Sequence, residues 1–485
     1  MTDDAKASEP QPPADYLVTS TGSIGSGEQR LEYHVSCGRM VLREEIIEDQ
    51  KFGGHQARAE IFHIAYTLDG AEPGSRPVTF AFNGGPGSSS VWLHLGLLGP
   101  RRVIMGDAGD LKPPPYAIED NLQTLLTETD LVFIDPVTTG FSRTVEGHRA
   151  DDFHGFGRDL ESVGEFIRLW ATRNGRWSSP KFLAGESYGT TRAAGLANRL
   201  QSEYGMYVNG VILISSILDF ASADFTEGND QAFALYLPTY AATAHYHGKL
   251  ADDLGELADV VAQAEDFAAR DLPYALARGS RLPDDERRAV IERYAGLTGL
   301  DPAYVDRADL RITLFDFVAE LLRDRQQLVG RLDTRFVGWL DHGNDSHMDY
   351  DPSYSAILGP YATAFNSYIR DECGFKIDIP YNILTPKVYP WSYKEFENSS
   401  VETATALAKA LRDNPALRVH ISCGYYDGAT PHFAAEHVIA HLRIPAAARE
   451  RIEWAYYEAE HMTYVHEPSR QQQSEDLGAF IRSAI

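Results

Sequence analysis

The pentapeptide Gly185-Glu186-Ser187-Tyr188-Gly189 constrains the fold of this chain more than any other segment. It directly follows the apolar run Phe182-Leu183-Ala184, and a helical pattern extends from Thr191 to Glu203 after it. A G-x-S-x-G motif between a strand and a helix is typical of a sharp turn that lifts the serine hydroxyl to the edge of a sheet. A glycine-containing loop with an ordinary serine is the alternative. The motif predicts a strand, a turn and a helix with Ser187 at the tip.

A serine hydroxyl becomes a nucleophile only with a base in hydrogen-bond reach and a third group that orients this base. Asp427 follows a strand-like run from Leu417 to Gly424, and His461 follows another from Ile452 to Tyr457. The order Ser, Asp, His is that of an α/β-hydrolase, in which these residues lie at the carboxyl ends of strands. We therefore expect Ser187, Asp427 and His461 to converge.

The sheet that carries these residues is predicted to be mostly parallel. From Tyr16 to about Leu68 the sequence alternates as an antiparallel edge does, and short apolar runs typical of buried parallel strands follow. Helical periodicity fills the intervals, most clearly from Phe156 to Ala171. Alternating strands and helices indicate an α/β fold with a doubly wound sheet. The apolar runs are Val78 to Phe82, Leu131 to Ile134, Phe182 to Ala184 and Val211 to Ile214.

A long interruption of this pattern indicates an inserted cap. Amphipathic helical segments such as Thr313 to Leu328 replace the strands there, and the strand pattern resumes near the predicted acid turn. We expect a mainly helical cap at residues 222–395 between two parts of one α/β-hydrolase core, 15–221 and 396–485. Residues 1–14 are rich in Asp, Glu, Ser and Pro, which favours a disordered tail.

Composition limits the partners of the chain. Its 485 residues carry a formal net charge of -26, from 70 acidic and 44 basic residues, which argues against binding to nucleic acid or to an anionic membrane. No apolar stretch has the length of a membrane helix or the place of a secretory signal. A count of three cysteines argues against a disulfide framework, so we expect a reducing, cytoplasmic location. The oligomeric state stays open, a homodimer included.

The loop from Asn83 to Ser90 is rich in glycine and follows the apolar run Val78 to Phe82. It lacks the Gly-Lys-Ser/Thr ending of a phosphate-binding loop and the glycine spacing of a dinucleotide site, which argues against nucleotide binding. In an α/β-hydrolase this loop supplies an N–H group to the oxyanion hole, and Gly85 lets the backbone approach the substrate closely. A turn of purely structural value is the alternative.

Four sequence blocks together resemble the serine carboxypeptidases, peptidase family S10, and within them a bacterial subgroup. They occur in the order of that family and extend over the whole predicted core. The resemblance implies an α/β-hydrolase that shortens peptide substrates from their carboxyl end, without a metal or an organic cofactor. The blocks are Asn83-Gly84-Gly85-Pro86-Gly87-Ser88-Ser89, Asp135-Pro136-Val137-Thr138-Thr139-Gly140-Phe141-Ser142, Gly185-Glu186-Ser187-Tyr188-Gly189 and His461-Met462.

Carried over position by position, the resemblance implies the catalytic roles. Ser187 is the nucleophile, His461 the general base and then acid, and Asp427 the residue that orients the imidazole. Gly85 and Tyr188 correspond to the residues whose N–H groups form the oxyanion hole.

The resemblance also implies a site for the terminal carboxylate of the substrate, formed by Asn83, Gly84 and Glu186. A glutamate can hold a carboxylate when it is protonated, and a low-dielectric pocket raises its pKa toward that state. The family usually adds a second glutamate, which favours acidic working pH, but that position is Leu97 here. The aromatic residue that commonly stands two before the Asn is replaced by Ala81.

Because of these departures, three arginines are candidates for supplying positive charge to the carboxylate site. Arg101, Arg102 and Arg192 each carry a guanidinium that can grip a carboxylate with two hydrogen bonds. A surface or structural ion pair is the alternative for each of them.

Two other features invite a functional interpretation. His432 lies near Asp427, but the pattern indicates that it begins the next helix. A run of acidic residues and histidines in the cap lacks the calcium-loop pattern and is interpreted as a polar loop, so no metal is expected. This run comprises Asp341, His342, Asp345, His347, Asp349 and Asp351.

Sequence reasoning leaves two rival functions. An esterase, amidase or acyltransferase of the same fold is favoured by the loss of the second glutamate at Leu97. A non-catalytic binding protein on a hydrolase scaffold is the other, and the complete set of Ser187, Asp427 and His461 argues against it.

Overall fold

The computed structural model of the chain describes residues 13–27, 30–342 and 348–485. Most of the predicted tail at 1–14 therefore lies outside the described residues. The same holds for Asp345 and His347 of the polar cap loop.

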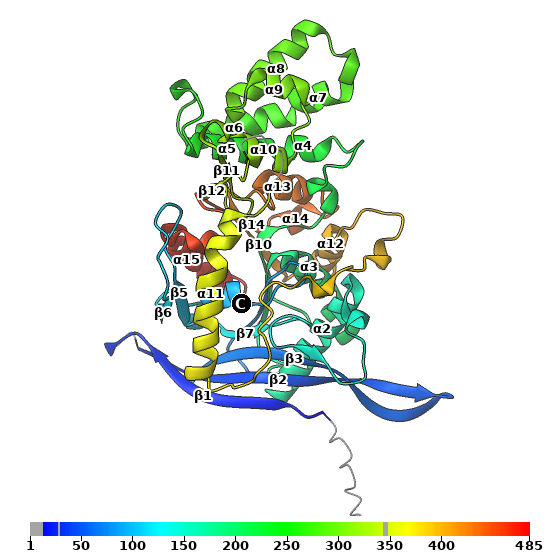
Figure 1. Ribbon diagram of the computed structural model, residues 1–485. Coiled ribbons are helices and arrows are strands. Elements are labelled where there is room, and N and C mark those ends of the chain that lie inside the picture. Colours follow the sequence, from blue (N-terminus) through cyan, green and yellow to red (C-terminus); the bar gives the residue numbers. More distant parts are fainter. Residues whose placement is uncertain (1–12, 28–29, 343–347) are drawn as a thin grey trace, which may run out of the picture.

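A large mixed sheet forms the centre of the molecule (Figure 1). Its middle strands run parallel, with β4 between β7 and β9, and β10 between β9 and β13. In sheet order the strands are β1 (Tyr16–Ile24), β2 (Leu31–Glu48), β3 (Lys51–Leu68), β7 (Asp130–Ile134), β4 (Val78–Phe82), β9 (Lys181–Ser187), β10 (Gly210–Ser216), β13 (Arg418–Gly424) and β14 (Ile452–Tyr457), and the short β8 (Arg143–Thr144) pairs with β3. This arrangement confirms the predicted α/β fold with a mostly parallel sheet.

Helices cover both faces of the sheet (Figure 1). On one face lie α2 (Phe156–Arg173), α3 (Tyr188–Tyr204), α12 (Ala404–Asp413) and α13 (His432–Ala440). On the other face lie α1 (Val91–Leu93), the π-helical turn His94–Leu98, α11 (Pro352–Asp371) and α15 (Glu467–Ser483). Neighbouring residues of β4 point into different layers, Phe80 into the first and Ala81 into the second. Because both faces are buried, the central strands are continuous apolar runs.

The antiparallel edge consists of β1, β2 and β3, as the alternation predicted. Strands β2 and β3 form one long hairpin that projects beyond the helical layers (Figure 1). Its turn residues Asp49 and Gln50 both have positive φ, which matches the twist that a tight hairpin turn requires. The small antiparallel pair β5 (Arg101–Ile104) and β6 (Ala117–Asp120) lies outside the main sheet.

A group of helices forms the cap at one end of the molecule (green in Figure 1). Their apolar sides share a cluster of buried residues separate from the two layers of the sheet. The elements are α4 (Gln231–Leu235), α5 (Leu237–Tyr246), α6 (Leu257–Ala269), α7 (Asp271–Arg278), α8 (Asp284–Thr298), α9 (Pro302–Arg307), α10 (Leu314–Glu320) and the hairpin of β11 (Gln327–Val329) and β12 (Val337–Trp339).

Helix α11 is packed differently from these cap helices. Ile357, Phe365 and Ile369 belong to the same buried cluster as α15 and the second face of the sheet. The division into a core at 15–221 and 396–485 and a cap at 222–395 stays a prediction, but the packing assigns α11 to the central layers. The remaining short helix is α14 (Ala446–Arg449), which precedes β14.

The helix expected from Thr313 to Leu328 ends early, at Glu320. Thr313 caps its first turn, a short 3-10 turn follows at Arg323–Arg325, and Gln326 ends that turn with a left-handed φ of 56°. Residues 327–329 then pair with 337–339 as a hairpin. The apolar residues that suggested one long helix thus belong to a short helix and a strand, both packed in the cap cluster.

Cys37, Cys373 and Cys423 are all buried and form no disulfide. Among the helices in the described residues, none has the length and apolarity needed to cross a bilayer.

Candidate active site

The predicted turn around Ser187 is present, because β9 ends at Ser187 and α3 begins at Tyr188. Ser187 has a φ of 60° and a ψ of -131°, and such a backbone strain typically costs about 1–3 kcal/mol. A Cβ atom at Gly189 would stand 2.7 Å from the carbonyl oxygen of Phe82, so this position needs glycine. The turn is therefore pressed against the end of β4, with Ser187 raised above the sheet.

Asp427 and His461 meet directly, as the chain order predicted. The Oδ2 atom of Asp427 lies 2.9 Å from Nδ1 of His461 and accepts a hydrogen bond of 2.7 Å from the hydroxyl of Thr430. Its Oδ1 atom accepts hydrogen bonds from the N–H groups of Ala429 (2.8 Å) and Thr430 (2.9 Å). A carboxylate fixed in this way orients the imidazole, and Nε2 is left for proton exchange.

The protonation of His461 is set by opposing effects. Burial lowers its pKa, but the charge and hydrogen bond of Asp427, together with the charge of Glu186, outweigh burial and raise the pKa above 6.5. A base with such a pKa accepts a proton readily near neutral pH.

A pocket of about 290 Å³ brings the predicted residues together. Its polar lining includes Ser187, His461 and Glu186, which come from two different strand ends. The loop after β4 contributes Asn83, Gly84 and Gly85 to the same lining. Carboxyl ends of neighbouring parallel strands meet at one edge of the sheet, which is why residues so distant in sequence line one pocket.

The loop that carries Asn83 is held in place by a buried arginine. Arg192 is fully buried, donates from Nη1 to the carbonyl oxygen of Asn83 (2.7 Å) and from Nε to Asp159 (2.7 Å). A Cβ atom at Gly84 would stand 2.4 Å from the backbone nitrogen of Tyr188, so the loop lies against the predicted oxyanion-hole donor. The oxyanion hole of Gly85 and Tyr188 stays a prediction.

The sequence block that begins at Asp135 supports the glycine-rich loop from Asn83 to Ser90. Asp135 is buried, and its Oδ1 atom accepts hydrogen bonds from both the N–H and the hydroxyl of Ser90, each 2.8 Å long. Burial raises the pKa of Asp135 to about 6, and the two bonds from Ser90 oppose this rise. The block around Asp135 therefore fixes the end of the glycine-rich loop.

Glu186 is buried beside Ser187 with both carboxyl oxygens occupied. Its Oε1 atom accepts a hydrogen bond from Nδ2 of Asn83 (2.8 Å), and its Oε2 atom accepts one from the hydroxyl of Tyr464 (2.6 Å). Burial raises the pKa of Glu186 to about 7, against the lowering effects of His461, Tyr464 and Asn83. Near neutral pH the carboxyl group therefore exists in both protonation states.

Tyr464, whose hydroxyl donates to Glu186, was missed by sequence reasoning. Burial and the charge of Glu186 hold its pKa well above 10, so the hydroxyl stays protonated. Its ring lies over Gly96, where a Cβ atom would stand 2.3 Å from Cε2 of Tyr464. Leu97, the next residue, is buried in the π-helical turn. The only available signal was the closeness of Tyr464 to His461 in sequence.

None of the three candidate arginines lines this pocket in the described part of the chain. Arg101 pairs with Asp120 and Glu372, and Arg102 pairs with Glu119 and Glu467. Arg192 supports the Asn83 loop from the buried side, as described above. A different arginine, Arg331 of the cap, lines the pocket instead.

The cap holds His461 from its backbone side. The N–H of His461 donates to the carbonyl oxygen of Leu332 (3.0 Å), in the loop between β11 and β12. Next to it, the buried Glu460 accepts a hydrogen bond of 2.6 Å from Nη2 of Arg335, which also pairs with Asp333. The position of His461 therefore depends on the cap as well as on the sheet.

His432 begins helix α13, as predicted, and its Nε2 atom lies 3.0 Å from Glu265 of helix α6. It therefore joins the cap to the core. No cluster of metal-ligating side chains occurs in residues 13–27, 30–342 and 348–485.

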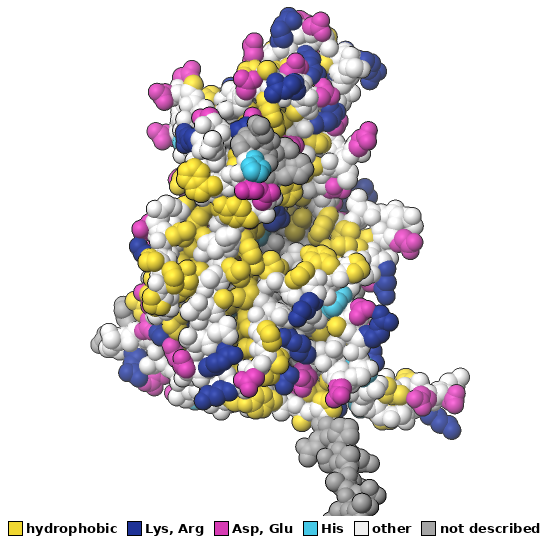
Figure 2. Space-filling view, in the orientation of Figure 1, with side chains coloured by type: hydrophobic (Ala, Val, Ile, Leu, Met, Phe, Trp, Pro, Cys, Tyr) yellow, Lys and Arg dark blue, Asp and Glu magenta, His cyan; other side chains and the backbone are white. Residues whose placement is uncertain are grey.

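Apolar side chains surround the entrance of the pocket. Leu384 and Tyr389 line it and are 45% and 57% exposed. Figure 2 shows that apolar side chains gather over the middle of this face and that the face is hollowed below the cap helices. An apolar entrance suits an extended segment with hydrophobic side chains.

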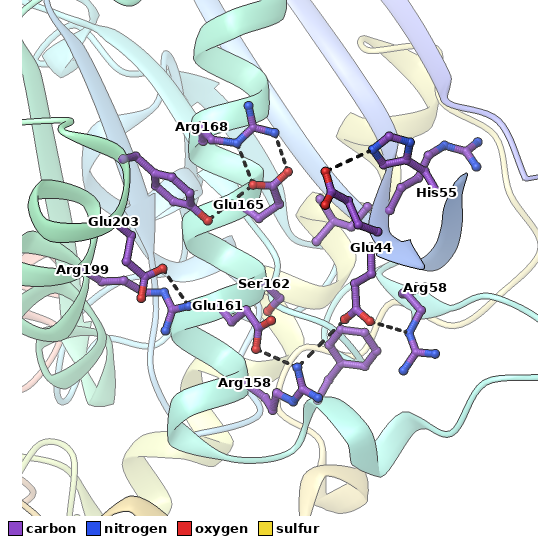
Figure 3. Close-up of a pocket in the computed structure, with 15 residues that line it drawn as sticks. Glu44, His55, Arg58, Arg158, Glu161, Ser162, Glu165, Arg168, Arg199 and Glu203 are labelled. Carbon is purple, nitrogen blue, oxygen red and sulfur yellow. Dashed lines mark hydrogen bonds and ion pairs between the residues drawn. The ribbon is translucent and has the colours of Figure 1, made fainter. Parts of the chain in front are cut away.

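A second cavity, of about 460 Å³, lies between the β2–β3 hairpin and helices α2 and α3 (Figure 3). Its lining is dominated by charged side chains that already pair with one another, so it offers no convergent reactive set. The pairs are Arg58 with Glu44, Arg158 with Glu161, Arg168 with Glu165 and Arg199 with Glu203.

The sheet order, the strained serine turn and the Ser, Asp, His order define the α/β-hydrolase fold. Comparison with known proteins agrees. Residues 53–250 match the model of the serine carboxypeptidase family, peptidase family S10. This match confirms the resemblance that the four sequence blocks predicted, and the protein is accordingly a hydrolase. No curated protein sequence matches the chain.

Similarity to one solved structure supports the fold. The carboxypeptidase Kex1(Δ)p of Saccharomyces cerevisiae, a prohormone-processing enzyme, is 14% identical with a TM-score of 0.54 over 93% of this chain and 92% of its own. The proline iminopeptidase of Mycobacterium smegmatis is 12% identical with a TM-score of 0.38 over 92% of this chain and 98% of its own. At these identities the likeness to Kex1(Δ)p establishes the fold alone, and the second score carries no argument.

Proposed function

We propose that the protein is a serine-type carboxypeptidase that releases C-terminal amino acids through an acyl-enzyme on Ser187. One observation carries this proposal: Glu186 and Asn83 are hydrogen-bonded to each other and line the same pocket as Ser187 and His461. A protonated Glu186 and the amide of Asn83 both donate hydrogen bonds to a carboxylate. An acyl-transfer site next to a carboxylate site suits cleavage of the last peptide bond.

The proposed chemistry gives each of these groups one role. The Oγ atom of Ser187 attacks the last amide carbonyl while Nε2 of His461 takes its proton. The N–H groups of Gly85 and Tyr188 hold the oxyanion, and one such donor is typically worth about a 100-fold gain in turnover. His461 then gives the proton to the nitrogen of the departing amino acid, and water hydrolyses the acyl-enzyme by the same steps in reverse order.

The pocket volume and the cap limit the substrates. A volume of about 290 Å³ is close to the lower end of the roughly 300–1,000 Å³ range of small-molecule pockets. It accommodates a single departing residue more readily than a continuing chain, which favours an exopeptidase over an endopeptidase.

Mass spectrometry of a peptide library after incubation tests the proposal. We expect residues to leave singly from the carboxyl end, and we expect the matched C-terminal amides to react much more slowly. Equal hydrolysis of acids, amides and simple esters would instead assign the protein to the esterases and amidases of this fold.

Labelling with a fluorophosphonate probe supplies the control. An adduct on Ser187 that is absent from Ser187→Ala is expected for a working nucleophile. A folded wild-type protein without the adduct would point to a binding protein on a hydrolase scaffold.

A further inference from the structure

Among the described residues that line the pocket, one is an arginine, Arg331, and none is a lysine. Arg331 lies in the loop that follows β11 and lines the pocket together with Glu186 and Ser187. The proposed mechanism above makes no use of this guanidinium. The charge of Arg331 lowers the pKa of His461, against the stronger raising effects of Asp427 and Glu186. Arg331 therefore acts electrostatically on the proposed catalytic histidine.

Arg331 is half-buried, yet no side chain of the described residues forms an ion pair or hydrogen bond with its guanidinium. The contrast with nearby Arg335 is direct, because Arg335 pairs with Asp107, Asp333 and Glu460. In a chain with 70 acidic residues, counter-charges are plentiful. A guanidinium left unpaired at the wall of a pocket is partly desolvated at a cost, which an anionic ligand would offset.

The backbone at Arg331 is fixed relative to the catalytic residues. The N–H of Arg331 donates to Oδ1 of Asp351 (3.1 Å), and the N–H of Leu332 donates to its Oδ2 atom (3.2 Å). The carbonyl oxygen of Leu332 accepts the N–H of His461. The segment that carries Arg331 is thus hydrogen-bonded both to Asp351, at the start of α11, and to His461, the proposed general base.

The lining of the pocket near Arg331 indicates which kind of ligand fits there. Trp92, Ile357 and Met462 are buried apolar residues of the lining. Arg331, Asn83 and Glu186 are among the polar groups that line the same pocket. The pocket therefore combines an apolar wall with a positive charge.

We propose that Arg331 binds a carboxylate of the departing C-terminal residue and thereby determines specificity. This inference rests on the proposed carboxypeptidase function. The carboxylate belongs to the terminal α-carboxyl group or to an acidic side chain of the departing Asp or Glu, and both have the same bidentate fit to a guanidinium.

Four proteins test the inference: wild type, Arg331→Gln, Arg331→Lys and Arg325→Gln. Arg325 is an exposed cap arginine that does not line the pocket, so its variant removes the same charge from the cap surface. The substrates are blocked peptides ending in Glu or Gln, each as the free acid and as the C-terminal amide, and kcat/KM is measured for all four.

We expect Arg331→Gln to lose about 10-fold to 100-fold in kcat/KM, the value of one charge-assisted hydrogen-bonded contact. If the α-carboxylate is bound, both free acids lose and both amides do not. If the side chain is bound, the peptides ending in Glu lose and those ending in Gln do not. Arg331→Lys should recover part of the loss, and Arg325→Gln should behave as wild type. An equal loss on all four substrates, or none, overturns the inference.

A second assay measures how well the peptides protect Ser187 from the fluorophosphonate probe. It distinguishes failure of this inference from failure of the proposed carboxypeptidase function. If the wild type labels but cleaves no peptide, the carboxypeptidase function fails while Arg331 can still be examined. The same acid and amide peptides are then used as competitors of labelling. Acids that protect wild type at least about 10-fold better than Arg331→Gln support carboxylate binding. Identical protection in the two proteins overturns it.

Discussion

Replacing Glu186 by Gln is expected to change how the stability of the protein depends on pH. The folded protein holds the pKa of this buried carboxyl group at about 7, through burial, against an ordinary value of 4.5. Between these values the unfolded chain has released a proton that the folded chain keeps. The stability present below pH 4.5 is therefore lost progressively as the pH rises to about 7.

The magnitude follows from the shift. A difference of about 2.5 pH units at 1.36 kcal/mol for each unit corresponds to about 3 kcal/mol. The glutamine side chain of the variant stays neutral at every pH and is close in shape to a protonated glutamate. The hydroxyl of Tyr464 can accept a hydrogen bond from the new amide in place of donating one. The variant should therefore lose about 3 kcal/mol less than wild type over this range.

Urea unfolding of both proteins at pH 4.5 and pH 7.5 measures this difference. Glu450→Gln serves as the control, because Glu450 is exposed at the surface. Its change of stability with pH should follow wild type. If wild type and Glu186→Gln lose stability in parallel, the carboxyl group is not held neutral by its surroundings and the reasoning is refuted.

Ser187→Ala should leave the fold intact and remove both fluorophosphonate labelling and peptide hydrolysis, by about 10⁴-fold or more in kcat; residual turnover near wild type would exclude the proposed nucleophile. Gly96→Ala places a Cβ atom 2.3 Å from Cε2 of Tyr464, so the ring must move away from its carboxyl partner. We expect a loss of about 10-fold in kcat/KM for free-acid peptides with esters spared, because Tyr464 would no longer position Glu186, and an equal loss on both would contradict this role of Tyr464. Arg335→Leu leaves buried carboxyl groups without a counter-charge and should cost about 3–5 kcal/mol in urea unfolding, whereas a cost below about 1 kcal/mol would show that water reaches them.

The catalytic candidates could be predicted because their signals are local. Ser187 stands in a pentapeptide whose glycines are required by close backbone contacts, and Asp427 and His461 each follow an apolar strand. The topology of parallel strands then brings all three to one edge of the sheet. Those steps need no knowledge of how distant side chains pack.

The residues that modify the pocket could not be predicted in the same way. Tyr464 reaches Glu186 only because Gly96, far away in sequence, leaves room for its ring. Arg331 reaches the pocket because the cap loop is hydrogen-bonded to the backbone of His461. Neither contact leaves a periodic or spaced pattern in the sequence, since both depend on tertiary packing.

Glu186 and His461 together set the expected pH dependence of catalysis. Besides burial, the charge of each shifts the pKa of the other, so their protons are shared as a pair. Attack requires a neutral His461, while binding of a substrate carboxylate requires a protonated Glu186, which together mean one proton on the pair. The pair takes up a second proton below the raised pKa of His461 and loses its last proton above about pH 7.

For free-acid peptides kcat/KM should therefore fall above about pH 7, where Glu186 loses its proton, and should also fall at acidic pH, where His461 is protonated. Amide and ester substrates bring no carboxylate to bind, so their kcat/KM should rise through the acidic limb and then stay level. In Glu186→Gln the alkaline limb for free acids should disappear as well, because the introduced side-chain amide donates a hydrogen bond at every pH. A profile for free acids that peaks near pH 4–5, where an unperturbed glutamate of pKa about 4.3 titrates, would contradict this coupling. An alkaline limb that persists in Glu186→Gln would assign it to another group.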